Sequence, residues 1–239
     1  MRWIYIFRLM YVVSAITVCT PLYAQQLSLK NTKLLGGKGH ESMYDMLYDT
    51  RDKSIVFTGY TWDSCGTGDL PPCPPVTGHR DLFIGKVDSG GQLLWIRQYA
   101  SKWDDVGTKL LITDSGYLVL GIAGFHDGDA ANNSYDFDGW VLKLNFQGNV
   151  VWKKGYGSPN GSDEIFGGTR TYDGGYIFTG NSNGSGGDIP FQYVISPAAI
   201  DGFVIKTDSI GNVRWSRTLG GTKDDGFINV FEVNKEYYL

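Results

Sequence analysis

The sequence predicts an all-β protein built from repeated units. One pattern occurs three times, at Asp81–Trp95, Asp138–Trp152 and Asp201–Trp215. The copies lie about 60 residues apart, and self-similarity at such a period indicates an array of equivalent structural units. The chain also has 33 glycines and 14% aromatic residues. This composition favours many short strands joined by tight turns.

Each unit is expected to begin with two strands. A short apolar segment forms the first strand, as at Lys109–Thr113 and Gly168–Thr171. A turn with glycine follows, because glycine accepts the positive φ that hairpin turns require. The second strands are expected at Ile55–Gly59, Tyr117–Gly121 and Tyr176–Gly180.

The repeated pattern itself supplies the third strand, a turn and the fourth strand. In the second unit, Trp140–Leu144 and Val150–Lys154 are the two strands, and the equivalent third strands are Leu82–Val87 and Phe203–Thr207. A long polar loop precedes each third strand and differs between units. Four strands in about 60 residues is the size of a propeller blade, so we expect a β-propeller-like array of four-stranded antiparallel blades.

Residues 25–239 are expected to form a single repeat domain. Its units span about 36–100, 101–157, 158–221 and an incomplete 222–239. About three and a third blades are fewer than the four to eight that usually close a ring. We therefore expect an incomplete ring with exposed sheet edges, and a chain that is a fragment of a longer protein.

Residues 1–24 are typical of a secretory signal peptide. Arg2 and Arg8 give a positive start, Leu9–Val18 is apolar, and Ala24 precedes the expected cleavage site. The apolar run is shorter than the roughly 20 residues that cross a bilayer. We predict an exported protein, extracellular, at the cell surface or periplasmic, with no transmembrane segment after signal removal. The alternative is an uncleaved membrane anchor.

Two cysteines follow the signal, Cys65 and Cys73, in a loop rich in proline and glycine. In an exported chain such a pair most simply forms a structural disulfide. A redox pair or a metal site is the alternative, but the spacing is not Cys-x-x-Cys and no histidine lies close by.

The charge balance bears on possible partners. The net charge is −4, and no cluster of Lys and Arg is present. Binding to nucleic acid requires a positive face that displaces counterions from phosphates, so we expect no nucleic-acid partner.

The repeat resembles a family of secreted bacterial β-propeller repeat proteins. Thr171–Tyr176, Asp138–Leu144 and Gly148–Trp152 carry the resemblance most closely, and Gly128-Asp129 and Gly187-Asp188 match its loop element. The resemblance implies a propeller, export and, in many members, a C-terminal sorting domain for type IX secretion. It implies no common catalytic activity.

A tryptophan closes each copy of the repeated pattern: Trp95, Trp152 and Trp215. Quinoprotein dehydrogenases also carry a blade tryptophan, eight positions after an aspartate and with a threonine before the glycine. Here each tryptophan follows an Asp or Asn by seven positions, and no threonine precedes the glycine. We predict that these side chains pack between neighbouring blades, as large aromatic residues often do. A quinoprotein-like oxidoreductase is the alternative.

Thr171–Phe178 also resembles the Asp-box turn of sialidase-type propellers, which stabilises the fold and takes no part in catalysis. Glycan cleavage needs two placed carboxylates. The many acids of the loops do not identify such a pair, so the sequence assigns no catalytic residue. A glycan-cleaving enzyme is a further alternative.

The loop Asp127–Asp138 is rich in oxygen ligands, and Asp127, Asp129 and Asp136 are its candidate calcium ligands. Calcium prefers six to eight oxygens. Asp and Asn are also ordinary turn formers, which is the alternative. We expect no other cofactor.

Two further polar positions recur in the pattern. Asp81, Asp138 and Asp201 stand at the start of a strand, which indicates a repeated turn or a backbone hydrogen bond. Lys86, Lys143 and Lys206 are expected to be solvated or ion-paired. Constant strands with variable loops are typical of scaffolds that bind ligands, so we predict a non-enzymatic module that binds a protein or a glycan.

Overall fold

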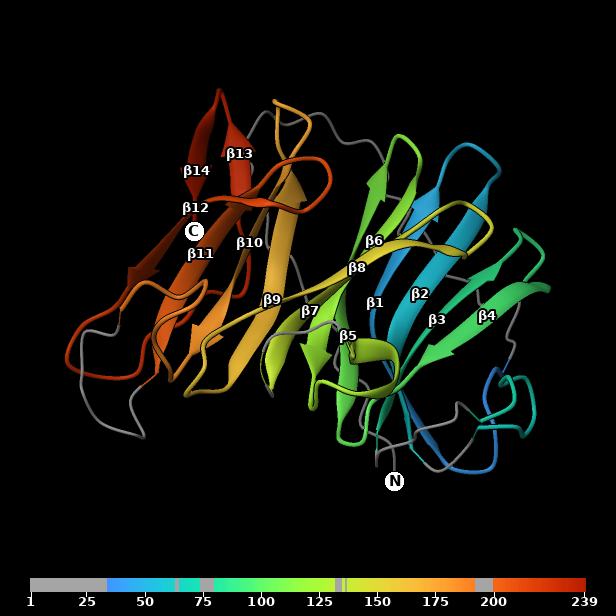
Figure 1. Cartoon of the computed structure of the whole chain (residues 1–239). Helices are drawn as coiled ribbons and strands as arrows, with labels where there is room; N and C mark the ends of the chain where they lie inside the picture. Colours follow the sequence, from blue (N-terminus) through green and yellow to red (C-terminus); the bar gives the residue numbers. More distant parts are fainter. Residues whose placement is uncertain (1–33, 63–64, 74–79, 132–134, 136, 192–199) are drawn as a thin grey trace, which may run out of the picture. The chain divides into compact units, whose positions relative to one another are not determined.

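A computed structural model describes residues 34–62, 65–73, 80–131, 135, 137–191 and 200–239. These residues form four-stranded antiparallel sheets arranged as blades (Figure 1), with no α-helix in the described ranges. The expected fold class is therefore confirmed: the protein is an all-β, propeller-like array whose sheets do not close into a ring. The expected signal peptide at 1–24 lies outside the described residues.

Three sheets follow one another along the chain, each with its strands in sequence order. The first contains β1 (His40–Asp49), β2 (Ser54–Trp62), β3 (Asp81–Val87) and β4 (Leu93–Tyr99). The second contains β5 (Asp105–Thr113), β6 (Gly116–Ala123), β7 (Asp138–Leu144) and β8 (Val150–Tyr156). The third contains β9 (Asp163–Arg170), β10 (Tyr176–Ser182), β11 (Asp201–Thr207) and β12 (Val213–Leu219).

Two short elements complete the described fold. The 3-10 turn η1 (Gly128–Ala130) lies in the loop between β6 and β7. A hairpin of β13 (Phe231–Val233) and β14 (Glu236–Tyr238) follows the third sheet. Tyr237 of this hairpin contacts Trp215 of the third sheet, so the hairpin takes the place of the first two strands of a further blade.

The hydrophobic core lies mainly between neighbouring sheets. Every residue of β3, β7 and β11 is buried. One apolar cluster joins Leu82 and Ile84 of the first sheet to Tyr117 and Trp140 of the second. A second cluster joins Leu118 and Leu120 of the second sheet to Phe178 of the third. Burial of such side chains contributes about 1.5–3 kcal/mol each and holds the blades side by side.

The repeated tryptophans lie where neighbouring blades meet. The ring centroids of Trp95 and Tyr117 are 6.2 Å apart, and those of Trp152 and Tyr176 are 6.4 Å apart. Gly148, in the turn after β7, packs on Trp95 with φ +79°, and an added Cβ would come within 2.9 Å of the indole. The turn glycine is therefore required both by its backbone conformation and by the close approach of the preceding blade.

The repeated aspartates are buried at the first positions of β3, β7 and β11. The residue before each one accepts a backbone hydrogen bond from the start of the following unit. Asp105 N donates to Arg80 O, Asp163 N donates to Phe137 O and Asp225 N donates to Ile200 O, each at 2.7 Å. The same bond thus joins the start of the third strand of each blade to the first residues of the next unit.

Cys65 and Cys73 form the expected disulfide. It closes a loop that packs on the start of the first unit, where Asp69 N donates to Gly36 O at 3.0 Å and Leu70 is buried. Replacing both cysteines with serine is expected to lower the free energy of unfolding by about 2 kcal/mol, since the closed loop restricts the unfolded chain. Urea denaturation measures this. A variant as stable as the oxidised wild type would contradict it, and the reduced wild type is the control.

Candidate functional site

The antiparallel order of the strands separates two ends of each blade. Long loops join the second and third strands at one end, together with the connection from each blade to the next. Short turns join the first to the second strand and the third to the fourth at the other end. We call these the loop end and the turn end. Each end carries a group of polar and aromatic side chains that could serve a function.

A pocket of about 560 Å³ opens at the loop end between the second and third sheets. We call it the loop pocket. Three connections contribute to it: β6 to β7, β8 to β9, and β10 to β11. Its lining residues are His126, Tyr135, Phe137, Pro159, Asn160, Gly161, Ser162 and Asn183. Pockets of 300–1,000 Å³ with a few polar groups are typical of small-molecule sites.

Phe137 is held at the rim of the loop pocket by an unusual backbone. Its φ is +56°, and its side chain is 43% exposed. This conformation is costly for a bulky side chain, by about 1–3 kcal/mol, and such strain is concentrated at functional sites. Its carbonyl accepts the inter-blade bond from Asp163, and its N–H donates to Gly124 O at 3.4 Å. The surrounding bonds therefore fix the exposed ring in place.

The opposite wall consists of two loops in direct contact. Ser162 N donates to Asn183 Oδ1 at 2.7 Å. An added Cβ on Gly161 would lie 2.4 Å from the backbone of Gly184, so only glycine allows this approach. Asn160 lies beside this junction and is exposed. The wall thus presents amide and hydroxyl groups on a fixed backbone.

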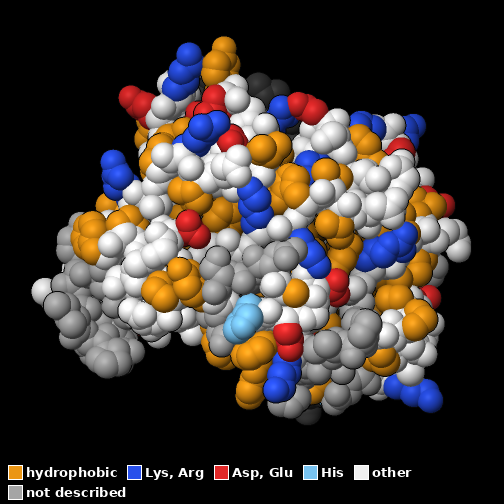
Figure 2. Space-filling model, in the orientation of Figure 1, with side chains coloured by type: hydrophobic (Ala, Val, Ile, Leu, Met, Phe, Trp, Pro, Cys, Tyr) orange, Lys and Arg blue, Asp and Glu red, His pale blue; other side chains and the backbone are white. Residues whose placement is uncertain are grey.

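His126 completes the pocket from the second sheet. Its ring stacks on Phe125 with a centroid distance of 4.7 Å and an interplanar angle of 19°. The described lining therefore combines aromatic rings with neutral hydrogen-bonding groups. It includes no carboxylate and no Lys or Arg. On the molecular face drawn in Figure 2, Lys and Arg side chains are scattered among uncharged and hydrophobic ones.

The calcium candidates bond to protein groups. Asp127 Oδ1 accepts a bond from Lys102 N at 2.8 Å, and Asp129 Oδ2 accepts one from Ala100 N at 3.2 Å. Asp136 lies outside the described residues. Within the described ranges, no group of three His, Cys, Asp or Glu side chains could hold a metal ion. Calcium binding by this loop stays a prediction.

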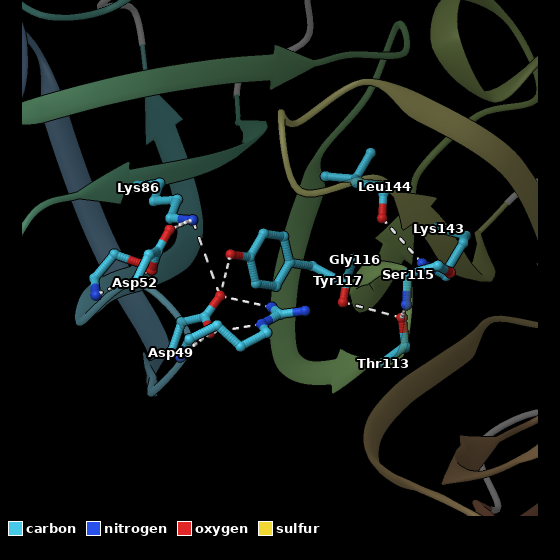
Figure 3. A network of polar contacts seen from close by, with 11 residues as sticks. Asp49, Asp52, Lys86, Thr113, Ser115, Gly116, Tyr117, Lys143 and Leu144 are labelled. Atoms are coloured by element: carbon cyan, nitrogen blue, oxygen red, sulfur yellow. Dashed lines mark hydrogen bonds and ion pairs between the residues drawn. The ribbon is translucent and has the colours of Figure 1, made fainter.

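A buried polar network lies at the turn end between the first and second sheets (Figure 3). Asp49 is 2% exposed and accepts hydrogen bonds from Arg51 Nε at 2.8 Å and from Tyr117 Oη at 2.6 Å. Lys86 Nζ donates to Asp52 Oδ2 at 2.5 Å and lies 3.9 Å from Asp49 Oδ2. We call this set of five residues the Asp49 network. It joins β1, β3 and β6, so it contributes to the junction of two blades.

The charges of the Asp49 network are matched to one another. Hydrogen bonds from Arg51 hold the pKa of Asp49 well below its usual range, and the Tyr117 hydroxyl acts in the same direction. Burial raises the pKa of Tyr117, and the bond to Asp49 adds to this effect. The network therefore contains an ionised Asp49 and a neutral Tyr117. In these protonation states the Tyr117 hydroxyl donates a hydrogen bond to the Asp49 carboxylate and stabilises the blade junction.

The repeated lysines are buried, which corrects the expectation that they are solvated. Lys86, Lys143 and Lys206 are 3–4% exposed. Lys86 and Lys206 are ion-paired as the alternative reading expected, with Asp52 and Asp173 respectively. Lys143 has no ion pair among the described residues and donates to Leu144 O at 3.0 Å. Burial lowers its pKa to about 8, and nearby Arg51 adds to the shift.

Sequence reasoning identified the loops as the variable element but did not predict that the residues of the loop pocket form one site. Its repeated aspartates and tryptophans lie at blade junctions and do not line the loop pocket, although Asp138 Oδ2 accepts a hydrogen bond from the lining residue Tyr135 N at 3.1 Å. No protein-family model matches the chain, and no curated protein matches it either. In the described ranges, no helix has the length and apolar character needed to span a membrane.

Proposed function

We propose that this protein is an exported, non-enzymatic binding module that recognises a glycan through the loop pocket. The observation that carries the proposal is the chemistry of the lining. Aromatic rings of Tyr135 and Phe137 lie near the neutral amides of Asn160 and Asn183. Sugars present apolar ring faces and many hydroxyl groups, and such a lining complements both.

Binding is favoured over cleavage by the same lining. Hydrolysis of a glycosidic bond requires two carboxylates about 5–9.5 Å apart across the scissile bond. The described lining supplies none, and its polar side chains carry two amides, two hydroxyls and an imidazole. Amides and hydroxyls hold a ligand by hydrogen bonds, and a single imidazole does not replace the pair of carboxylates.

Two observations support export. The disulfide between Cys65 and Cys73 is typical of proteins that fold in an oxidising compartment. Residues 1–24 have the sequence of a secretory signal. A glycan-binding module outside the cytoplasm would meet polysaccharides of the cell surface or of the surroundings.

A glycan array followed by calorimetry with the full chain tests the proposal. We expect binding to neutral oligosaccharides, and we expect Phe137→Ala to weaken it at least tenfold, since loss of a stacking ring costs about 1.4 kcal/mol or more. Asn160→Ala should weaken it to a lesser degree. Tyr172→Ala, which removes a 79% exposed ring from a turn at the other end, is the matched control. Absence of binding to any glycan, or release of reducing sugar, would overturn the proposal.

A further inference from the structure

A second pocket lies at the turn end between the second and third sheets. Its volume is about 460 Å³, and it is lined by Ser115, Lys143, Trp152, Arg170, Asp173 and Tyr176 among others. We call it the Lys143 groove. It belongs to the turn end, whereas the loop pocket lies at the other end of the same blades.

The repeat provides an internal comparison for Lys143. In the three sheets, Lys86, Lys143 and Lys206 occupy the same register position, each opposite the tryptophan of the next strand. Lys86 Nζ lies 2.5 Å from Asp52 Oδ2, and Lys206 Nζ lies 2.9 Å from Asp173 Oδ2. In both cases the carboxylate comes from the turn between the first and second strands of the same sheet.

In the second sheet, no carboxylate of the turn pairs with the lysine among the described residues. Asp114 stands three positions before Tyr117, as Asp173 stands three positions before Tyr176, but the Asp114 carboxylate pairs with Arg170 of the third sheet. The turn is also shorter, since Thr113 pairs directly with Gly116. Figure 3 shows Ser115 and Lys143 on this turn and the adjacent strand, with the Lys143 ammonium directed to Leu144 O.

The acids that line the groove already have partners. Asp114 forms a bidentate ion pair with Arg170. Asp173 pairs with Lys206 and accepts a bond from Thr171 Oγ1 at 2.6 Å. Among the described residues that line the groove, Lys143 is therefore the charged side chain without an ion-pair partner. It is 4% exposed. A buried ammonium is stable only with an opposite charge or full hydrogen bonding, and one carbonyl bond satisfies one of its three donors.

We propose that the Lys143 groove binds a small organic carboxylate. The ligand carboxylate would occupy the place that Asp52 and Asp173 fill in the other two blades, and would accept hydrogen bonds from the Lys143 ammonium. Trp152 and Tyr176, whose rings lie 6.4 Å apart, give the ligand body an aromatic wall. A carboxylate fits better than phosphate because the equivalent lysines, Lys86 and Lys206, form their short ion pairs with carboxylates of the turn.

NMR titration of the full chain tests the proposal with acetate, D-glucuronate, D-glucose and inorganic phosphate as probes. We expect acetate and glucuronate to bind at the same site and glucose and phosphate not to bind there. Tighter binding of glucuronate than of acetate would identify a sugar acid as the ligand class, and equal binding would identify a simple carboxylate. Binding of phosphate without acetate would overturn the proposal, as would no change in the signals of groove residues with either carboxylate.

Two variants and a control separate this site from a general loss of structure. Lys143→Met should weaken carboxylate binding at least tenfold. Ser115→Asp should do the same while keeping the lysine, because it adds an internal carboxylate to the lining that Ser115 shares with Lys143. Lys109→Met removes a lysine that pairs with Asp45 elsewhere and should leave binding unchanged. Unfolding curves confirm that each variant is folded, and unaltered binding by Lys143→Met or Ser115→Asp would refute the site.

Discussion

Replacement of Asp49 by asparagine is expected to lower the free energy of unfolding by about 2–3 kcal/mol at pH 7, because it removes a buried carboxylate whose partner Arg51 is 38% exposed and partly screened by solvent. The Asp49 carboxylate is 2% exposed and accepts two side-chain bonds from Arg51, at 2.8 and 2.6 Å. An amide of the same size removes the charge but fills the same space. Arg51 and Lys86 would then share the single carboxylate of Asp52, and the Tyr117 hydroxyl would lose a charged acceptor.

The effect of Asp49 should depend on pH with a defined sign. Arg51 holds the pKa of Asp49 below its usual value in the folded protein. The folded pKa is thus lower than the unfolded one, so the stabilisation is fully present above about pH 4 and is lost as the pH falls below it. Urea unfolding at pH 7 and pH 3 measures this. The difference between wild type and Asp49→Asn should be large at pH 7 and smaller at pH 3.

Two controls define the contribution of the carboxylate. Tyr117→Phe keeps Asp49 ionised and removes one hydrogen bond, so it should cost about 1–2 kcal/mol. Asp114→Asn breaks an exposed ion pair with Arg170 and should change stability little, because solvent screens such pairs. Equal stability of Asp49→Asn and wild type at pH 7 would show that the Asp49 network does not stabilise the blade junction.

The repeat explains why so much of the fold could be predicted. The expected third strand Trp140–Leu144 lies within β7, and the expected second strand Tyr176–Gly180 lies within β10. Both are short apolar runs bounded by turn residues, and the other units give independent copies of the same signal. The sequence pattern does not predict the first strand of the first sheet, His40–Asp49. Its apolar side chains are mixed with charged ones, and Tyr44 and Met46 are more than half exposed, so its pattern differs from that of a buried strand.

The candidate sites were harder to predict because each one depends on contacts between blades. Phe137 and Asn183 belong to different units, and only the arrangement of two loops brings them into one pocket. Arg51 and Tyr117 likewise meet through Asp49 across a blade junction. Periodicity assigns residues to strands but does not give the position of one loop relative to another. Such convergence requires the packed structure.

The exception of the second unit could not be predicted from the sequence. Asp114 stands three positions before Tyr117, as Asp173 stands three positions before Tyr176, so both turns contain the acid. In the folded blades the Asp173 carboxylate reaches Lys206, whereas Asp114 pairs with Arg170. The contact of Asp173 with Lys206 joins residues 33 positions apart, and only the folded blade shows it.

Substitution of the three repeated lysines by methionine is expected to raise the free energy of unfolding at Lys143 and to lower it at Lys86 and Lys206. Lys143→Met should raise the free energy of unfolding by about 1 kcal/mol, a value reduced to allow for partial hydration of the groove. Lys86→Met should lower it by about 2 kcal/mol, because it leaves Asp52 unpaired beside the buried Asp49. Lys206→Met should lower it by a smaller amount, because its partner Asp173 is 64% exposed.

The pH dependence of Lys143 distinguishes this explanation from simple packing. Burial lowers its pKa to about 8, below the value of 10.5 for an ordinary lysine. The folded protein therefore binds this proton less readily than the unfolded chain does. The cost of the charge is fully present below pH 8 and disappears as the pH rises toward 10.5. The gain from Lys143→Met should accordingly be largest at pH 7 and should vanish near pH 10.5, whereas a gain from better packing would persist at both.

A residue that lowers stability at a repeated position is a candidate for a role outside folding, since the other two blades show that a stabilising arrangement was accessible to this chain. Denaturation of wild type and Lys143→Met at pH 7, with and without sodium acetate, tests whether the destabilising Lys143 also binds the carboxylate. Acetate should stabilise the wild type and leave Lys143→Met unchanged, so the advantage of the variant should shrink as acetate rises, with sodium chloride at equal ionic strength as the control. If acetate stabilises both proteins equally, the carboxylate binds elsewhere and Lys143 has no part in holding it.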